Sequence, residues 1–119
     1  MEISLFERLG REKVLFQVVE EFYNLVLQDH RVSGFFADVD MVRLRQHQLS
    51  FLSALLGGPE SYSGRSMRSA HRTLQLKEHH FQAIADNLSE ALRRFGVSED
   101  DIVAVLQKVS AYQGEIVTA

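Results

Sequence analysis

Five histidines and no cysteine occur in the chain, which excludes disulfides, thiolate catalysis and cysteine-ligated zinc or iron–sulfur sites. The histidine with the most informative surroundings is His71, in the stretch MRSAHRTLQL. Met67, Ala70 and Leu74 lie at spacings that place its ring in an apolar setting. Such a histidine is either a metal ligand or, more commonly, a core residue whose ring nitrogens are satisfied.

The other histidines have more polar neighbours. His30 lies in a polar turn, and His79 with His80 opens a helix next to Lys77 and Glu78. Successive helical residues point about 100° apart, so His79 and His80 do not hold one ion well. We expect them to be surface residues or to pack at the helix N-terminus.

Polar side chains interrupt two apolar helix faces. Gln48 lies in the same stripe as Leu44 and Phe51, His47 is one position round from it, and Tyr23 lies on an earlier apolar helix. A buried amide without a partner costs roughly 1–3 kcal/mol. Either Gln48 reaches water and Tyr23 bonds a carbonyl, or the two converge on one pocket as neutral donors.

Helices must position these residues, because apolar residues recur at spacings of three and four and no alternating strand pattern occurs. The sequence predicts an all-α fold. Long helices are expected over 11–28, from a cap at Asp38 or Asp40 to about 56, over 76–95, and after Ser98, which pairs with Asp101 as a cap. Short helices are expected over 4–9 and around 67–72. A plain four-helix bundle would not need the loop GGPESYSGRS or the short segment after it.

Composition narrows the function classes. The length of 119 residues predicts one domain, 1–119, and a formal charge of −3 gives no basis for binding nucleic acid. The run LSFLSALLGG is too short to span a membrane, and no secretory leader is recognisable. We therefore expect a soluble cytoplasmic protein without nucleic-acid or membrane partners.

Several segments together resemble the group I truncated haemoglobins, in their cyanobacterial-like form. They are LFERLG, VVEEFYNLVLQD, FFADVDM, QHQLSFLSALLGGPE, YSGRSMRSAH and HHFQAIADNL, in the family's order and spacing. The resemblance implies a truncated globin fold, a two-on-two helical sandwich around haem with a long loop before a very short proximal helix. That fold would account for the loop and the short segment.

The resemblance also implies roles for residues. His71 matches the proximal iron ligand, Tyr23 and Gln48 match distal ligand-stabilising positions, and His47 matches a position where some members place a sixth ligand. The residues expected to line the haem are Phe36, Leu44, His47, Phe51, Leu55, Met67, Leu74, Phe81 and Ile84. Tyr62, Arg65 and Arg68, with Arg43, are candidates for binding the propionates.

The chain departs from the family pattern in places. Arg11 follows Gly10 where many members have a second glycine, and the segment after His71 lacks a glycine often found there. No histidine follows His80, whereas some cyanobacterial relatives attach a C-terminal histidine covalently to the haem. We therefore expect non-covalent haem b.

The activity implied is reversible binding of O2, NO and CO, with nitric oxide dioxygenation as the leading reaction. No GxGxxG motif is present, so iron would need an external reductase. We expect a monomer. One alternative is a bis-histidyl haem protein, using His71 and His47 for electron transfer or for detoxifying peroxide or reactive nitrogen species. Another is a haem-free helical module whose apolar groove takes a partner helix.

Overall fold

The computed structural model describes residues 3–58 and 75–117, and every regular element in these ranges is helical. The elements are α1 (Leu5–Leu9), α2 (Arg11–Gln28), the 3-10 helix η1 (Ser33–Phe36), α3 (Met41–Leu55), α5 (Glu78–Arg94), α6 (Glu99–Ser110) and α7 (Gln113–Ile116). This confirms the predicted all-α class. No helix in the described ranges is long and apolar enough to cross a membrane.

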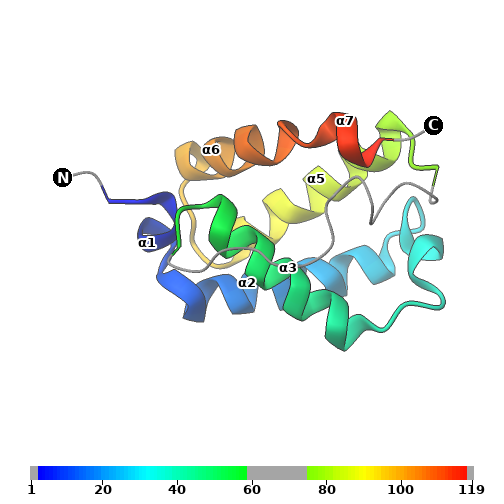
Figure 1. Ribbon diagram of the computed structural model, residues 1–119, viewed down its shortest axis with the longest axis horizontal. Helices are drawn as coiled ribbons and strands as arrows, with labels where there is room; N and C mark the ends of the chain where they lie inside the picture. Colours follow the sequence, from blue (N-terminus) through cyan, green and yellow to red (C-terminus); the bar gives the residue numbers. More distant parts are fainter. Residues whose placement is uncertain (1–2, 59–74, 118–119) are drawn as a thin grey trace.

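The helices form two layers (Figure 1). Helix α2 with α3 makes the lower layer in this view, and α5 with α6 makes the upper one. Helix α2 packs against α1, α3, η1 and α5, while α5 also packs against α6. The arrangement is the two-on-two sandwich that the resemblance to the truncated haemoglobins implies.

The apolar stripe of α2 forms the centre of the core. Its buried residues are Leu15, Val18, Val19, Phe22, Tyr23 and Val26, as the spacing predicts. Leu25, expected on the same face, is only half-buried. Leu5, Phe6 and Leu9 of α1 join this core from one end, and the backbone N–H of Phe6 donates to the carbonyl of Leu56 at 2.9 Å.

Capping residues set the helix boundaries. The Ser4 hydroxyl accepts from the backbone N–H of Glu7 at 3.2 Å, and the Ser98 hydroxyl accepts from that of Asp101 at 3.2 Å. At the start of α3, the sequence does not decide whether Asp38 or Asp40 is the N-cap residue. The structure selects Asp40, whose carboxylate accepts from the N–H of Arg43 at 3.2 Å.

Helices α1 and α2 meet at Gly10 without a linker. Gly10 has φ = 111° and Arg11, the residue that departs from the family pattern, has φ = 63°, so both occupy the left-handed region. A Cβ at residue 10 would overlap the side chain of Val14. Only glycine fits at position 10, and Arg11 carries backbone strain there.

Two elements were not predicted. Helix η1 falls within residues 29–40, which the sequence marks as turns, and α7 follows a break at Ala111 and Tyr112. Each is a single turn, so its apolar residues never complete the helical period on which sequence recognition rests. Helix η1 matters because it carries Phe35 and Phe36 to the end of α2.

A polar network ties the turn before η1 to α5. Arg31 Nη2 lies 2.7 Å from Asp29 Oδ2, and Asn87 Nδ2 donates to the same oxygen at 2.9 Å. The Arg31 guanidinium and the Asn87 amide hold the pKa of the Asp29 carboxyl well below its usual range. The network thereby fixes the corner that presents Phe36.

Gly10→Ala should lower the free energy of unfolding by roughly 2–4 kcal/mol, because it adds left-handed strain and a clash with Val14. Gly34→Ala is the matched control, since a Cβ there meets nothing within 4 Å. Chemical denaturation of the haem-loaded protein measures both changes. Equal stabilities for the two variants would contradict the steric explanation.

Asp29→Asn should flatten the dependence of stability on acid pH. Because the folded-state pKa of Asp29 is depressed, its stabilising contribution is present above the unfolded value and is lost as pH falls toward the folded value. Thermal unfolding followed by circular dichroism between pH 5 and pH 2 tests this, because the contribution is lost below the unfolded pKa of the carboxyl. The exposed Asp38→Asn control should keep the wild-type slope, and a wild-type slope for Asp29→Asn would show that the network does not act electrostatically.

Candidate functional site

The predicted distal residues lie on the paired helices α2 and α3. Tyr23 is buried at 4 % exposure on α2, whereas Leu44 and Gln48 on α3 are half-buried and His47 is exposed. Phe36, at the end of η1, meets Tyr23 edge-on with ring centroids 6.1 Å apart. The structure therefore brings Tyr23 and Phe36 into contact and places Gln48 on the helix packed beside them.

Burial keeps the Tyr23 phenol protonated. Removal from water raises the pKa of Tyr23 far above its usual range, and the positive charge of Arg45 opposes that rise only in part. Buried tyrosines usually donate a hydrogen bond to a nearby carbonyl. The Tyr23 hydroxyl makes no such bond within residues 3–58 and 75–117. Tyr23 is a neutral O–H donor at physiological pH.

The other described members of the predicted haem lining are apolar. Phe51 and Phe81 are buried, and Leu55 and Ile84 are half-buried against the core. Phe51 also meets Tyr112 edge-on, with ring centroids 5.2 Å apart. Apolar side chains beside neutral O–H and N–H donors fit haem and a small ligand of low charge.

Several predicted residues lie outside the described ranges. They are Tyr62, Arg65, Met67, Arg68, His71 and Leu74. Their roles in ligating iron, lining haem and binding propionates stay predictions.

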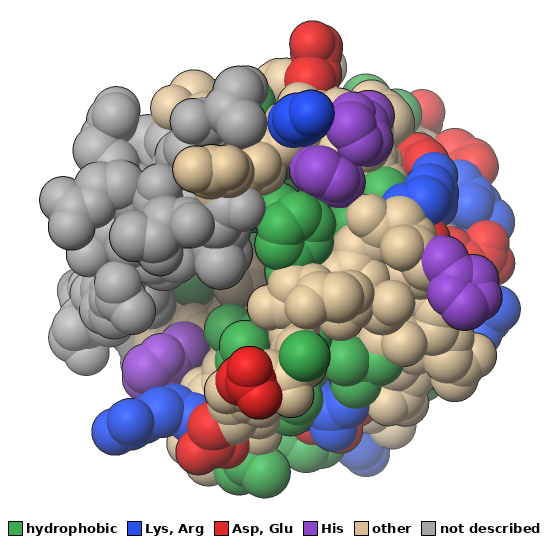
Figure 2. Space-filling model, turned by 90° about the vertical axis from the view of Figure 1, so that its right-hand side faces the viewer, with side chains coloured by type: hydrophobic (Ala, Val, Ile, Leu, Met, Phe, Trp, Pro, Cys, Tyr) green, Lys and Arg blue, Asp and Glu red, His purple; other side chains and the backbone are tan. Residues whose placement is uncertain are grey.

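The histidine pair at the start of α5 packs locally, as predicted. His80 Nδ1 accepts from the backbone N–H of Lys77 at 3.0 Å, and its ring meets Phe35 edge-on at 4.9 Å. Partial burial and the neighbouring His79 and Lys77 charges lower the pKa of His80. Figure 2, which views the right-hand side of Figure 1, shows histidines and charged groups around an apolar area. No group of three or more metal-binding side chains gathers in the described part of the chain.

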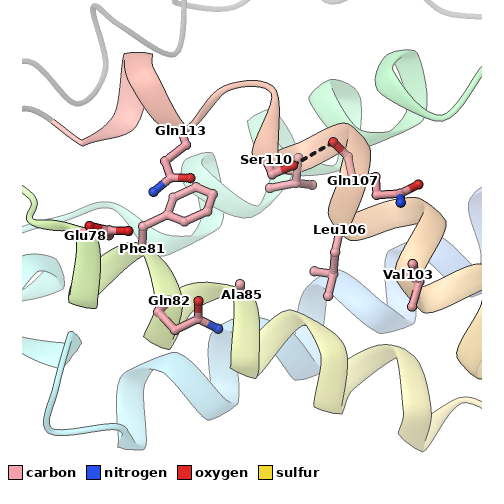
Figure 3. A pocket seen from close by; sticks show the side chains of 10 residues that line it. Glu78, Phe81, Gln82, Ala85, Val103, Leu106, Gln107, Ser110 and Gln113 are labelled. Atoms are coloured by element: carbon pink, nitrogen blue, oxygen red, sulfur yellow. Dashed lines mark hydrogen bonds between the residues drawn. The ribbon is translucent and has the colours of Figure 1, made fainter.

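A hollow of about 340 Å³ opens between α5, α6 and the start of α7 (Figure 3). It is lined by Glu78, Phe81, Gln82, Ala85, Val103, Leu106, Gln107, Val109, Ser110 and Gln113. Among the described residues, Phe81 is the one predicted haem-lining residue in this hollow, and Tyr23, Leu44 and Gln48 of the predicted distal site do not line it.

Sequence reasoning missed Arg45. A second hollow, of about 300 Å³, lies between α2 and α3 and includes Glu20 and Arg45 in its lining. Arg45 Nη1 donates to Glu20 Oε2 at 3.0 Å, and Nη2 donates to Asn24 Oδ1 at 3.2 Å. The only available signal was a basic residue near Gln48 and an acidic one near Tyr23, and their pairing depends on how the helices pack.

Residues 4–118 match the family model described as bacterial-like globin. A group 1 truncated haemoglobin of Synechocystis is 44 % identical over 106 residues, which cover 86 % of each chain. One of Tetrahymena pyriformis is 41 % identical over 96 residues, covering 81 % of this chain and 79 % of the relative.

Solved structures agree with these relatives. The Fe(III) form of the Tetrahymena pyriformis truncated haemoglobin superposes with a TM-score of 0.93 at 35 % identity, covering 96 % of this chain and 97 % of that one. The 2/2 haemoglobin from Synechococcus, in the cyanomet state with covalently attached haem, gives 0.91 at 38 % identity, with 98 % and 100 % covered. The matched length, the two-on-two helices and the donor-bearing apolar site agree, and the chain belongs to the group I truncated haemoglobins, a haem-binding branch of the bacterial-like globins.

Proposed function

We propose that this protein binds O2, CO and NO reversibly and converts NO to nitrate with electrons from an external reductase. When bound, haem supplies the ferrous iron that holds a diatomic ligand and at which dioxygen oxidises nitric oxide. The observation that carries the proposal is the buried, neutral Tyr23, whose hydroxyl is not spent on a carbonyl of the described residues.

The proposal gives His71 the proximal position. A neutral imidazole offers one ring nitrogen to iron, and its other N–H seeks a backbone carbonyl, which fixes the ring and tunes its basicity. Phe36, Phe51, Phe81 and Ile84 exclude water from the site. Since no histidine follows His80 in the sequence, the haem is held without a covalent bond from a C-terminal histidine.

On the distal side, Tyr23 and Gln48 act as hydrogen-bond donors. A ligand that gains electron density becomes a charged acceptor, and each donor stabilises it by about 1–3 kcal/mol. Such a gain slows ligand release by roughly tenfold to a hundredfold per donor. Leu44 adds bulk without a donor, which leaves Tyr23 and Gln48 to hold the ligand.

The alternative with His47 as sixth ligand has less support. The His47 side chain is exposed on α3, one position round from Gln48. Because Tyr23 and Gln48 already supply two donors on the distal side, the proposal places His47 at the haem rim, near water or a propionate. We propose that the protein acts as a cytoplasmic monomer. A separate reductase would supply the electrons, because the sequence has no nucleotide-binding GxGxxG motif.

Tyr23→Phe should speed oxygen dissociation about tenfold or more, because the variant loses one donor and keeps the ring. Stopped-flow ligand replacement measures the rate, and nitrate analysis after mixing the oxygenated protein with one equivalent of NO measures the reaction. Tyr112→Phe is the matched control, since its ring contact with Phe51 survives the change. An unchanged dissociation rate in Tyr23→Phe, or no nitrate from the wild type, would refute the proposal.

His47→Ala should leave the visible spectrum of the ferrous, ligand-free protein unchanged. The wild type should already show the broad bands of a five-coordinate, high-spin iron. A sharp low-spin band pair in the wild type that disappears in His47→Ala would instead support the bis-histidyl alternative.

A further inference from the structure

Arg45 joins the two helices of the predicted distal site. It lies on α3, three positions before Gln48, and its side chain is 25 % exposed. One guanidinium nitrogen donates to Glu20 and another to Asn24, at 3.0 and 3.2 Å. Its third nitrogen, Nε, is buried without a hydrogen-bond partner among the described residues.

The two acceptors flank Tyr23 on α2. Glu20 is three positions before Tyr23 and therefore its neighbour on the helix surface, and Asn24 follows Tyr23 directly in the same turn. The Arg45 charge reaches the phenol, since it opposes the effect of burial on the pKa of Tyr23. The guanidinium therefore sits beside the turn of α2 that presents Tyr23.

We propose that Arg45 is a positioning residue of the distal site. By spanning Glu20 and Asn24 it fixes the Tyr23 turn of α2 against the Gln48 turn of α3. Its positive charge also strengthens the Tyr23 hydroxyl as a donor, because a nearby cation favours electron density on the phenol oxygen. This inference rests on the proposed role of Tyr23 as a ligand-stabilising donor.

Stability alone does not account for this arrangement. Exposed ion pairs contribute little to folding, and a buried donor left unpaired is destabilising. The planar guanidinium contacts two acceptors from one rigid fork, which a lysine cannot do. The two contacts of Arg45 fix the position of α2 relative to α3 next to Tyr23.

The chain offers a matched control in Arg94. Arg94 Nη1 lies 3.0 Å from Glu21 Oε2 and links α5 to α2 through the neighbouring glutamate. Like Arg45, Arg94 forms an ion pair with a glutamate of α2 from another helix. Glu21 is two positions from Tyr23, so its side chain points to another side of the helix.

The test measures the C–O stretching frequency of the ferrous CO complex together with the rate of oxygen dissociation. Donation to bound CO lowers that frequency, so Arg45→Met should raise or split the band and speed oxygen dissociation about threefold to tenfold. Arg94→Met should leave both readouts at wild-type values. Arg45→Lys, which keeps the charge and loses the two-point contact, should fall between Arg45→Met and wild type.

A double-mutant cycle shows whether Arg45 acts through Tyr23. In a Tyr23→Phe background, Arg45→Met should have a much smaller effect on both readouts, because only the placement of Gln48 can still change. A full Arg45→Met effect in that background, or no effect in the wild-type background, would overturn the inference. If Tyr23→Phe alone changes neither readout, the proposed role of Tyr23 as a ligand-stabilising donor is refuted.

Asn24→Leu covers the case in which Arg45→Met does not fold or retain haem. It removes one of the two contacts and keeps the Glu20 pair. The variant should shift both readouts in the direction of Arg45→Met by a smaller amount. Wild-type values for Asn24→Leu, with a changed Tyr23→Phe, would contradict the positioning role.

Discussion

The packing of α2 between α3 and α5 is the contact on which the rest of the structure depends. One side of α2 supplies the apolar stripe of the core, and the same helix carries Tyr23, whose ring contacts Phe36. Neighbouring glutamates on the same helix pair with α3 through Arg45 and with α5 through Arg94. Core packing and distal geometry are therefore set by one helix, and a shift of α2 changes both.

Burial gives Tyr23 its chemistry as well as its place. Because the Tyr23 side chain is held at 4 % exposure, its phenol stays neutral. Phe22 and Phe36 meet its ring at 4.8 and 6.1 Å and restrict its rotation. In the proposed function, this donor is ordered before a ligand arrives, which reduces the entropy lost on binding.

Sequence patterns predicted the parts of this molecule that depend on near neighbours in the chain. The bounds of α2, the stop at Gly10 and the Ser98 cap follow from local spacing and turn chemistry, and the structure confirms them. The choice of Asp40 over Asp38 required the side-chain hydrogen bond itself. Arg45 was missed because its partners lie on another helix, and only the packing of α2 against α3 shows which glutamate it meets. The prediction that His71 is a ligand came from the resemblance, since its local pattern is more common for a core histidine.

The hydrogen bond from Phe6 to Leu56 bears on the order in which the chain folds. It joins two elements far apart in sequence, whereas α1 and α2 are covalent neighbours at Gly10. Closing so long a loop before α2 and α3 have paired costs more chain entropy than closing it afterwards. We therefore expect α1 to dock late, onto an assembled pair of helices, and to be among the first parts to open transiently in the native protein. Amide protons of α1 would then exchange with solvent sooner than those in the middle of α2.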